Sequence, residues 1–247
     1  MNASIMQDLD SPESLIVKMF ATMTPPDEAF DLDGHWTHVY DDATSFKAGW
    51  SQGGVAVEHS PDRRLRIVSF RNCPQGYKYW MLADLQCSDD AWCTPVSWSV
   101  ESKIAKMAKD SAYLKSGITM HAAVRDGVLT LTKGSARRIL ELPGAYTCKG
   151  CLLDAVGRMA RQGLKEMSFT MLDEYDEPCP EQKIVFCEQR KIGTRTGSVD
   201  IISYRHTGIA TVPGVFYVDT AGRVLAYLGD MQLLILQSTE NSPRTTP

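Results

Sequence analysis

Residues 213–236 read PGVFYVDTAGRVLAYLGDMQLLIL, and this stretch has the clearest strand pattern in the chain. Gly214–Val218 and Arg223–Leu228 are rich in β-branched and aromatic residues, as strands are. Asp219–Gly222 has the composition of a four-residue hairpin turn, and Gly229–Asp230 turns the chain again. We therefore predict three antiparallel strands. Because they are so apolar, other parts of the chain must cover one of their faces.

Working outward from this stretch, the rest of the chain contains many short extended runs divided by turn residues. Short connections of this kind imply antiparallel neighbours. Gly53–Gly54 interrupts one run, and we predict a hairpin tip there. Asp126–Gly127 is a strong hairpin signal. The runs are 35–42, 45–59, 63–70, 77–85, 117–124, 126–134, 135–142, 165–174, 183–193 and 197–209.

Three segments have a helical pattern. The first follows Ser11–Pro12, which suit an N-cap and a first helical position, and ends before Thr24–Pro26. The second is 102–114, where Lys, Ala and Met replace the strand alternation. The third, 151–162, has the clearest apolar stripe and ends at Gly163.

These elements predict a mainly β fold. We expect one large curved antiparallel sheet, a half-barrel or open barrel, with a few short helices and helix 151–162 packed on its inner face. A two-sheet sandwich is the alternative. The predicted organisation is a peripheral N-terminal helix and linker (1–33), a single β-rich domain (34–237) and a disordered tail (238–247).

Composition narrows the classes of partner. The formal net charge is −4 and the pI is near 5.7, so we expect no nucleic-acid partner. No run approaches the roughly 18–20 apolar residues of a transmembrane helix. Residues 1–15 lack a signal-peptide pattern, and seven cysteines leave at least one thiol unpaired. Together these features predict the cytoplasm by default, and they leave the oligomeric state open.

From Leu152 to Leu236, the order of elements resembles a group of uncharacterised bacterial proteins. Their exported members end in a proline, an aromatic strand, an Asp-x-x-Gly-Arg turn and a final pair of strands, as Pro213 and Asp219–Arg223 do here. The order is also similar in plan to the half-barrel fold of periplasmic lipoprotein carriers. This resemblance implies a fold, a periplasmic location if a leader is missing from this sequence, and no catalytic residues.

Cys148-Lys-Gly-Cys151 is the one compact motif whose residues could support redox chemistry or metal binding. At the start of a helix such thiols become redox-active, but a thioredoxin-like βαβ context is missing. A zinc site needs a second ligand pair, and the spacing of Cys87 and Cys93 does not repeat the motif. We therefore favour a structural role over a metal or redox role, and predict no metal.

Other candidate groups are scattered. His35 and His38 lie three apart in a predicted strand, where they point to opposite faces. The acidic pairs fall in predicted turns, and no phosphate loop, dinucleotide fingerprint or catalytic elbow is present, so we expect no cofactor and no catalytic residue. The acidic pairs are Asp89–Asp90, Asp173–Glu174 and Asp176–Glu177.

A sheet with many strands and few helices leaves an apolar concavity that side chains or a ligand must fill. We therefore expect a non-catalytic domain that binds an apolar or amphipathic, lipid-like ligand there. The alternatives are an enzyme whose site converges in the same concavity and a structural module with a filled core. The sequence names no ligand-binding residues.

Overall fold

The computed structural model describes residues 12–25, 30–42, 53–73, 77–90, 92–106, 116–229 and 232–240. The helices are α1 (Pro12–Thr22), the single-turn 3-10 helix η4 (Lys149–Cys151) and α2 (Leu152–Arg161). The first strands are β1 (Trp36–Asp42), β2 (Gly53–Ser60), β3 (Arg64–Cys73), β4 (Tyr77–Cys87), β5 (Pro95–Lys106), β6 (Ser116–Arg125), β7 (Val128–Lys133) and β8 (Ala136–Glu141). The remaining strands are β9 (Tyr146–Cys148), β10 (Glu166–Asp173), β11 (Glu177–Thr194), β12 (Gly197–Thr207), β13 (Gly214–Asp219), β14 (Val224–Gly229) and β15 (Gln232–Glu240).

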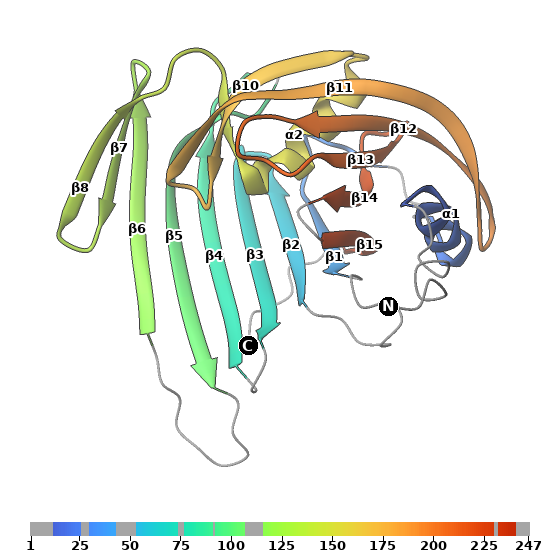
Figure 1. The fold of residues 1–247 in the computed structure, drawn as a ribbon, viewed down its shortest axis with the longest axis horizontal. Helices are drawn as coiled ribbons and strands as arrows, with labels where there is room; N and C mark the ends of the chain where they lie inside the picture. The colour runs from blue at the N-terminus through green and yellow to red at the C-terminus, as the bar shows by residue number, and fades with distance from the viewer. Residues whose placement is uncertain are drawn as a thin grey trace, which may run out of the picture.

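All of these strands belong to one sheet, in the order β8-β7-β6-β5-β4-β3-β2-β1-β15-β14-β13-β12-β11-β10-β9. Neighbouring strands are antiparallel except β9 and β10, which are parallel. The first and last strands of the chain, β1 and β15, pair in the middle of the sheet. Figure 1 shows the sheet curling over so that α2 lies on its inner side. The predicted single curved sheet is confirmed, and the sandwich alternative is wrong.

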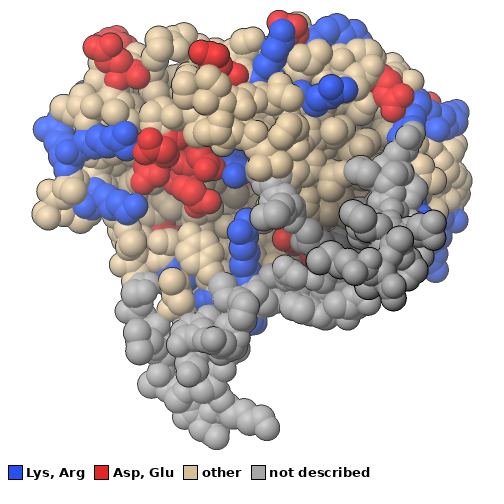
Figure 2. Space-filling view, in the orientation of Figure 1, with Lys and Arg blue, Asp and Glu red and all other residues tan. Residues whose placement is uncertain are grey.

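The two edge strands of the sheet, β8 and β9, follow each other in the chain and are separated only by residues 142–145. Side chains link the two ends of the sheet. Arg138 Nη1 donates a hydrogen bond of 2.9 Å to Glu177 Oε2, and Lys133 Nζ donates one of 3.4 Å to Asp176 Oδ2. Side chains of both signs lie next to one another on this side of the molecule (Figure 2). The fold is therefore barrel-like, with exposed ion pairs at the seam.

Helix α2 is positioned by the apolar stripe that its sequence predicts. Leu152, Val156 and Met159 are buried, and the helix packs against β13 and β14. It ends at Gly163, which has a left-handed φ of 69°. Leu164 N then donates to Met159 O at 3.0 Å, as in a glycine-terminated helix. The predicted helix on the inner face is confirmed.

Helix α1 packs on the long strand β11. Its Ile16, Met19 and Phe20 side chains are buried, and the Phe20 ring meets Tyr217 edge-on with a centroid distance of 6.1 Å. Arg195 N donates to Met23 O at 3.0 Å just after the helix. A helix of this length is marginal alone, so this docking stabilises it. No helix in the described residues is long and apolar enough to span a bilayer.

Three local predictions need correction. The helix predicted from residue 102 is wrong as far as Lys106, because Pro95–Lys106 is a strand paired on both sides; residues 107–114 lie outside the described part. Two ladders override the helix preference of Lys and Ala there. Gly53–Gly54 forms no hairpin tip but starts β2, where a Cβ on Gly53 would collide with the Phe70 carbonyl oxygen. Residues 238–240 of the predicted tail continue β15 and pair with β1; residues 241–247 are not described.

Candidate functional site

A cavity of about 190 Å³ lies between the inner face of the sheet and the N-terminal turn of α2. Strands β2, β3 and β4 contribute to it from one half of the sheet, and β13, β14 and β15 from the other. An apolar cavity of about 150 Å³ is large enough to bind benzene, so this cavity has room for a small apolar group. Its apolar lining includes Ile67, Phe70, Met81, Leu153, Phe216 and Leu234.

Charged and amide side chains also line the cavity. With its amide oriented to accept, Gln232 takes a hydrogen bond of 3.1 Å from Arg71 Nε. Lys149 Nζ lies 3.0 Å from Asp173 Oδ1. Glu174, in the turn between β10 and β11, is a further charged group in the lining. A mainly apolar cavity with a few polar groups is typical of sites that bind amphipathic small molecules.

The hydroxyl group of Tyr175 is a buried polar group in the lining of this cavity. Tyr175 is 2% exposed, and its hydroxyl has no hydrogen-bond partner among the described residues. The β10–β11 turn places it there, with left-handed φ values of 48° at Glu174 and 69° at Tyr175. Burial raises the pKa of Tyr175 well above its usual range. The hydroxyl therefore stays protonated and can donate a hydrogen bond to an acceptor atom of a ligand.

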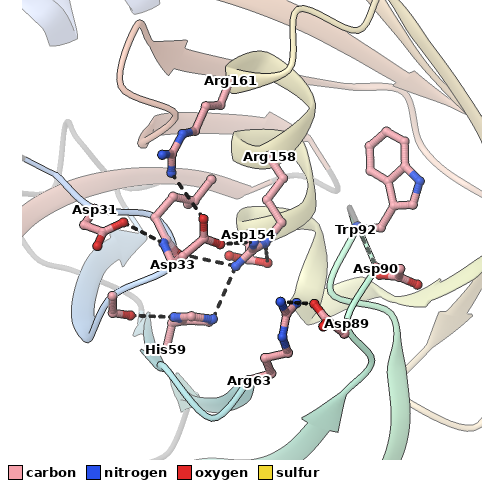
Figure 3. A network of polar contacts seen from close by, with 12 residues as sticks. Asp31, Asp33, His59, Arg63, Asp89, Asp90, Trp92, Asp154, Arg158 and Arg161 are labelled. Atoms are coloured by element: carbon pink, nitrogen blue, oxygen red, sulfur yellow. Dashed lines mark hydrogen bonds and ion pairs between the residues drawn. The ribbon is translucent and has the colours of Figure 1, made fainter.

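Helix α2 is fixed beside the cavity by an ion-pair network in which Arg158 and Asp154 are buried and Asp33 is exposed (Figure 3). Arg158 Nε donates a 2.7 Å hydrogen bond to Asp154 Oδ2, and Arg158 Nη1 donates another of 2.7 Å to Asp33 Oδ1. Burial raises the pKa of Asp154, and the charge and hydrogen bond of Arg158 oppose that rise. The network joins α2 to the turn before β1, so it holds the cavity wall at a fixed distance from the sheet.

His59 of β2 extends the same network. Its Nε2 lies 3.2 Å from Arg158 Nη2 and its Nδ1 lies 2.7 Å from Gly34 O. Because a guanidinium group only donates, Nε2 accepts and the proton is assigned to Nδ1. Burial opposes protonation of His59, but the neighbouring Cys93 thiol, the Gly34 carbonyl oxygen and the Asp154 charge raise its pKa. The His59 ring also stacks on Trp36.

The cysteine motif of the sequence lies at the entry to α2. Cys148 and Cys151 are 0% and 1% exposed, and their thiols interact directly. Cys87, at the end of β4, and Cys93, in the turn before β5, are also buried and in direct interaction. The two pairs are close to each other, since Cys151 raises the pKa of Cys87 and Cys93 raises the pKa of Cys151. We call these four residues the thiol cluster.

Sequence spacing alone missed this cluster. A hairpin brings Cys87 and Cys93 together across a turn, and the curl of the sheet brings that hairpin to η4, so no regular spacing is required. Within the described residues, no three His, Cys, Asp or Glu side chains have the arrangement of a metal site.

The remaining candidate residues of the sequence do not converge. Asp90 Oδ1 accepts from Trp92 N at 3.1 Å and Thr94 N at 2.9 Å, which makes Asp90 a turn-forming residue. His38 is buried and stacks on Trp36, whereas His35 is partly exposed and 4.0 Å from Glu58. The other acidic pairs lie in or beside the β10–β11 turn.

Two residues that the sequence analysis did not single out also line the cavity. His206 of β12 lines the cavity, and its Nε2 lies 3.0 Å from Gln182 Oε1. Tyr227 of β14 also lines the cavity, and its ring lies 4.5 Å from that of Phe216. Trp36 and Trp98 are buried in the core instead of lining the cavity. Strand alternation predicts which face His206 occupies, but not what lies opposite it.

Comparison with known proteins identifies a solved structure with a similar fold. No protein-family model matches the chain, and no curated protein sequence matches it. Among solved structures, it is similar to a "beta-barrel-like protein of domain of unknown function DUF1849" from Brucella abortus. The TM-score is 0.54 and the identity 12%, over 84% of this chain and 97% of that chain. The two proteins share a barrel-like fold.

This similarity confirms the predicted likeness to uncharacterised bacterial β-rich proteins at the level of the fold. At 12% identity it transfers no functional residue. The further resemblance to lipoprotein carriers stays a prediction.

Proposed function

We propose that this barrel-like domain binds an apolar or amphipathic, lipid-like ligand, without catalysis, in the cavity between the sheet and α2. The observation that carries the proposal is the cavity itself, about 190 Å³ with a lining of aliphatic and aromatic side chains. An apolar part of the ligand would lie against Ile67, Met81 and Leu153. A polar end would meet the Tyr175 hydroxyl, and Arg71 is a cation in the same lining.

The predicted resemblance to the half-barrel of lipoprotein carriers is consistent with a lipid-like ligand. An enzyme in the same concavity is the competing function. The two cations in the cavity lining support it less well, since Lys149 is paired with Asp173 and Arg71 with Gln232. A general base or nucleophile in this lining would need a partner that activates it.

Calorimetric titration with straight-chain carboxylates of increasing length tests the proposal. We expect saturable binding that strengthens by about 0.8 kcal/mol for each buried methylene, until the chain outgrows the cavity. Native mass spectrometry of the freshly purified protein would show any co-purified ligand directly. No saturable heat for any chain length, together with no bound mass, would contradict the proposal.

A pair of tryptophan variants makes the test specific for the cavity. Met81→Trp adds a large ring to the lining and should abolish binding. Ile139→Trp, on edge strand β8, adds the same ring at a side chain that is 58% exposed, and binding should be unchanged. Equal loss of binding in both variants would show that the ligand binds elsewhere.

A further inference from the structure

The thiol cluster is a second candidate for chemistry, separate from the proposed ligand cavity. Cys87, Cys93, Cys148 and Cys151 are all 4% exposed or less. None of them lines the cavity. Buried cysteines pack as small apolar residues without needing each other, so the pairing of all four sulfurs is the feature to explain.

The backbone brings each pair together. Cys87 and Cys93 flank the β4–β5 turn, in which Ser88 N donates to Thr94 O at 2.8 Å and Cys93 N donates to Asp90 O at 3.3 Å. Cys148 is the last residue of β9 and the N-cap of η4, and Cys151 is the last residue of that single turn. In both places a tight turn joins the two cysteines, and each thiol interacts with its pair partner.

Cys93 is the distinctive member of the cluster. Its backbone is left-handed, with a φ of 53°, which a residue with a Cβ adopts only when its surroundings hold it there. Its thiol interacts with both Cys87 and the His59 imidazole. The Cys87 thiol, and after it the His59 imidazole, lower the pKa of Cys93, whereas the pKa of Cys87 is raised. A thiol with a lowered pKa is the attacking group in disulfide exchange.

We propose that the thiol cluster is a site of thiol–disulfide exchange that forms two disulfides, Cys87–Cys93 and Cys148–Cys151. In the first pair, the Cys93 thiolate attacks a disulfide such as oxidised glutathione. This forms a mixed disulfide and releases one glutathione thiolate. The deprotonated Cys87 sulfur then attacks the Cys93 sulfur, forms the Cys87–Cys93 bond and releases the second glutathione.

The exchange balances for each pair. The protein loses two electrons and two protons, and one glutathione disulfide becomes two glutathione thiols. The second pair, Cys148–Cys151, reacts in the same way. Because the sulfurs are buried, exchange takes place while the chain folds or when the β4–β5 turn opens.

Peptide mapping tests the pairing. The full chain is unfolded in reductant, refolded with a mixture of oxidised and reduced glutathione, unfolded again in denaturant with iodoacetamide so that every free thiol is blocked, and digested with trypsin. Cys87 and Cys93 fall in one peptide, 79–103, whereas cleavage after Lys149 separates Cys148 (139–149) from Cys151 (150–158). We expect peptide 79–103 to lack two hydrogens and to carry no label. We also expect peptides 139–149 and 150–158 to be joined by a disulfide.

Three results would overturn the proposal. The first is full alkylation of all four sulfurs after oxidative refolding to a protein with a native circular dichroism spectrum. The second is disulfides that join the cluster to Cys187, which is exposed on β11. The third is stoichiometric zinc in the protein as purified, released only when the sulfurs are alkylated.

Single variants test the order of attack independently of the final pairing. Cys87→Ser removes the second nucleophile, so a mixed disulfide with glutathione should accumulate on Cys93. Cys93→Ser leaves Cys87 alone, and we expect at least five-fold less mixed disulfide on it. Cys187→Ser, outside the cluster, should leave both intrachain disulfides unchanged. Equal accumulation in the two cluster variants would show that Cys93 is not the attacking thiol.

Discussion

The guanidinium group of Arg158 donates a 2.7 Å hydrogen bond to the carboxylate of Asp154 one helical turn earlier, and both side chains are buried. An isolated charge in this position would lack solvent, so each partner depends on the other. Arg158 also reaches Asp33, which comes just before β1. Arg158 therefore joins the helix that forms one wall of the cavity to the residues just before β1.

Removal of one partner of this pair should destabilise the protein strongly. Arg158→Met keeps much of the side-chain volume but leaves the Asp154 carboxylate buried without a cation, and we expect a loss of about 3–5 kcal/mol in the free energy of unfolding. Urea unfolding followed by circular dichroism measures it. Arg161→Gln removes an exposed cation 3.6 Å from Asp33 and should cost at most about 1 kcal/mol. Similar losses in both variants would contradict a special role for the buried pair.

The close approach of α2 to the β13–β14 turn gives a second prediction. A Cβ on Gly157 would collide with the carbonyl oxygen of Gly222. Gly157→Ala should therefore force the helix away from the sheet and cost about 1–3 kcal/mol, although alanine favours helix formation. Gly193→Ala on β11 is the matched control, because nothing lies within 4 Å of the added methyl group. A Gly157 variant as stable as the control would show that this helix–turn contact is loose.

His38 should make the stability of the folded protein decrease as the pH falls. Burial, and then the charge of Arg223, lower the pKa of His38 to about 3 in the folded protein, against 6.5 for a free histidine. Between these values the unfolded chain binds a proton that the folded chain does not. The contribution of His38 to stability is therefore complete above pH 6.5 and is lost as the pH falls towards 3, by about 1.4 kcal/mol per unit.

The variant His38→Phe isolates this effect, because phenylalanine keeps the stacking contact with Trp36 and cannot bind a proton. We expect the unfolding free energy of the wild-type protein to fall more steeply than that of the variant between pH 6.5 and 4.5. Guanidinium chloride titrations at several pH values measure both slopes, and contributions from His59 cancel in the difference. Parallel slopes would mean that His38 is protonated in the folded protein.

Local patterns in the sequence predicted much of the fold. The Asp126–Gly127 pair forms a tight turn with φ values of 50° and 74°, and the turn at Asp219 is held by its carboxylate, which accepts from Ala221 N at 3.0 Å. In such turns one or two residues determine the geometry. The inward position of α2 was also predicted locally, because its apolar stripe must be buried against the sheet.

The candidate site could not be predicted in this way, because its parts come from distant positions. Asp33 and Arg158 meet across 125 residues, and the curl of the sheet that brings them together is a property of the whole sheet. Tyr175 shows the same limit. Its acidic neighbours indicate a solvated turn, and the turn does form, but its left-handed backbone directs this one side chain into the interior.

Tyr175 provides the last prediction. Its hydroxyl is buried without a hydrogen-bond partner in the described residues, and such a group costs about 1–3 kcal/mol. Tyr175→Phe removes only that oxygen, so the unliganded protein should become more stable by roughly that amount. In Tyr204→Phe the removed hydroxyl donates to Leu164 O at 3.1 Å, and its loss should destabilise the protein by about 1 kcal/mol. Thermal unfolding measures both changes, and we expect a higher melting temperature for Tyr175→Phe and a lower one for Tyr204→Phe.

The same variant links the hydroxyl to the proposed ligand. If the unpartnered oxygen is kept because it donates to a polar group of the ligand, Tyr175→Phe should weaken the binding of carboxylates about ten-fold, as expected for one lost hydrogen bond. Binding of a hydrocarbon such as benzene, which accepts no such bond, should not weaken. A destabilised Tyr175→Phe protein would mean that the hydroxyl has a partner in the unliganded state. Unchanged carboxylate affinity would place the polar end of the ligand beside another group, such as Arg71.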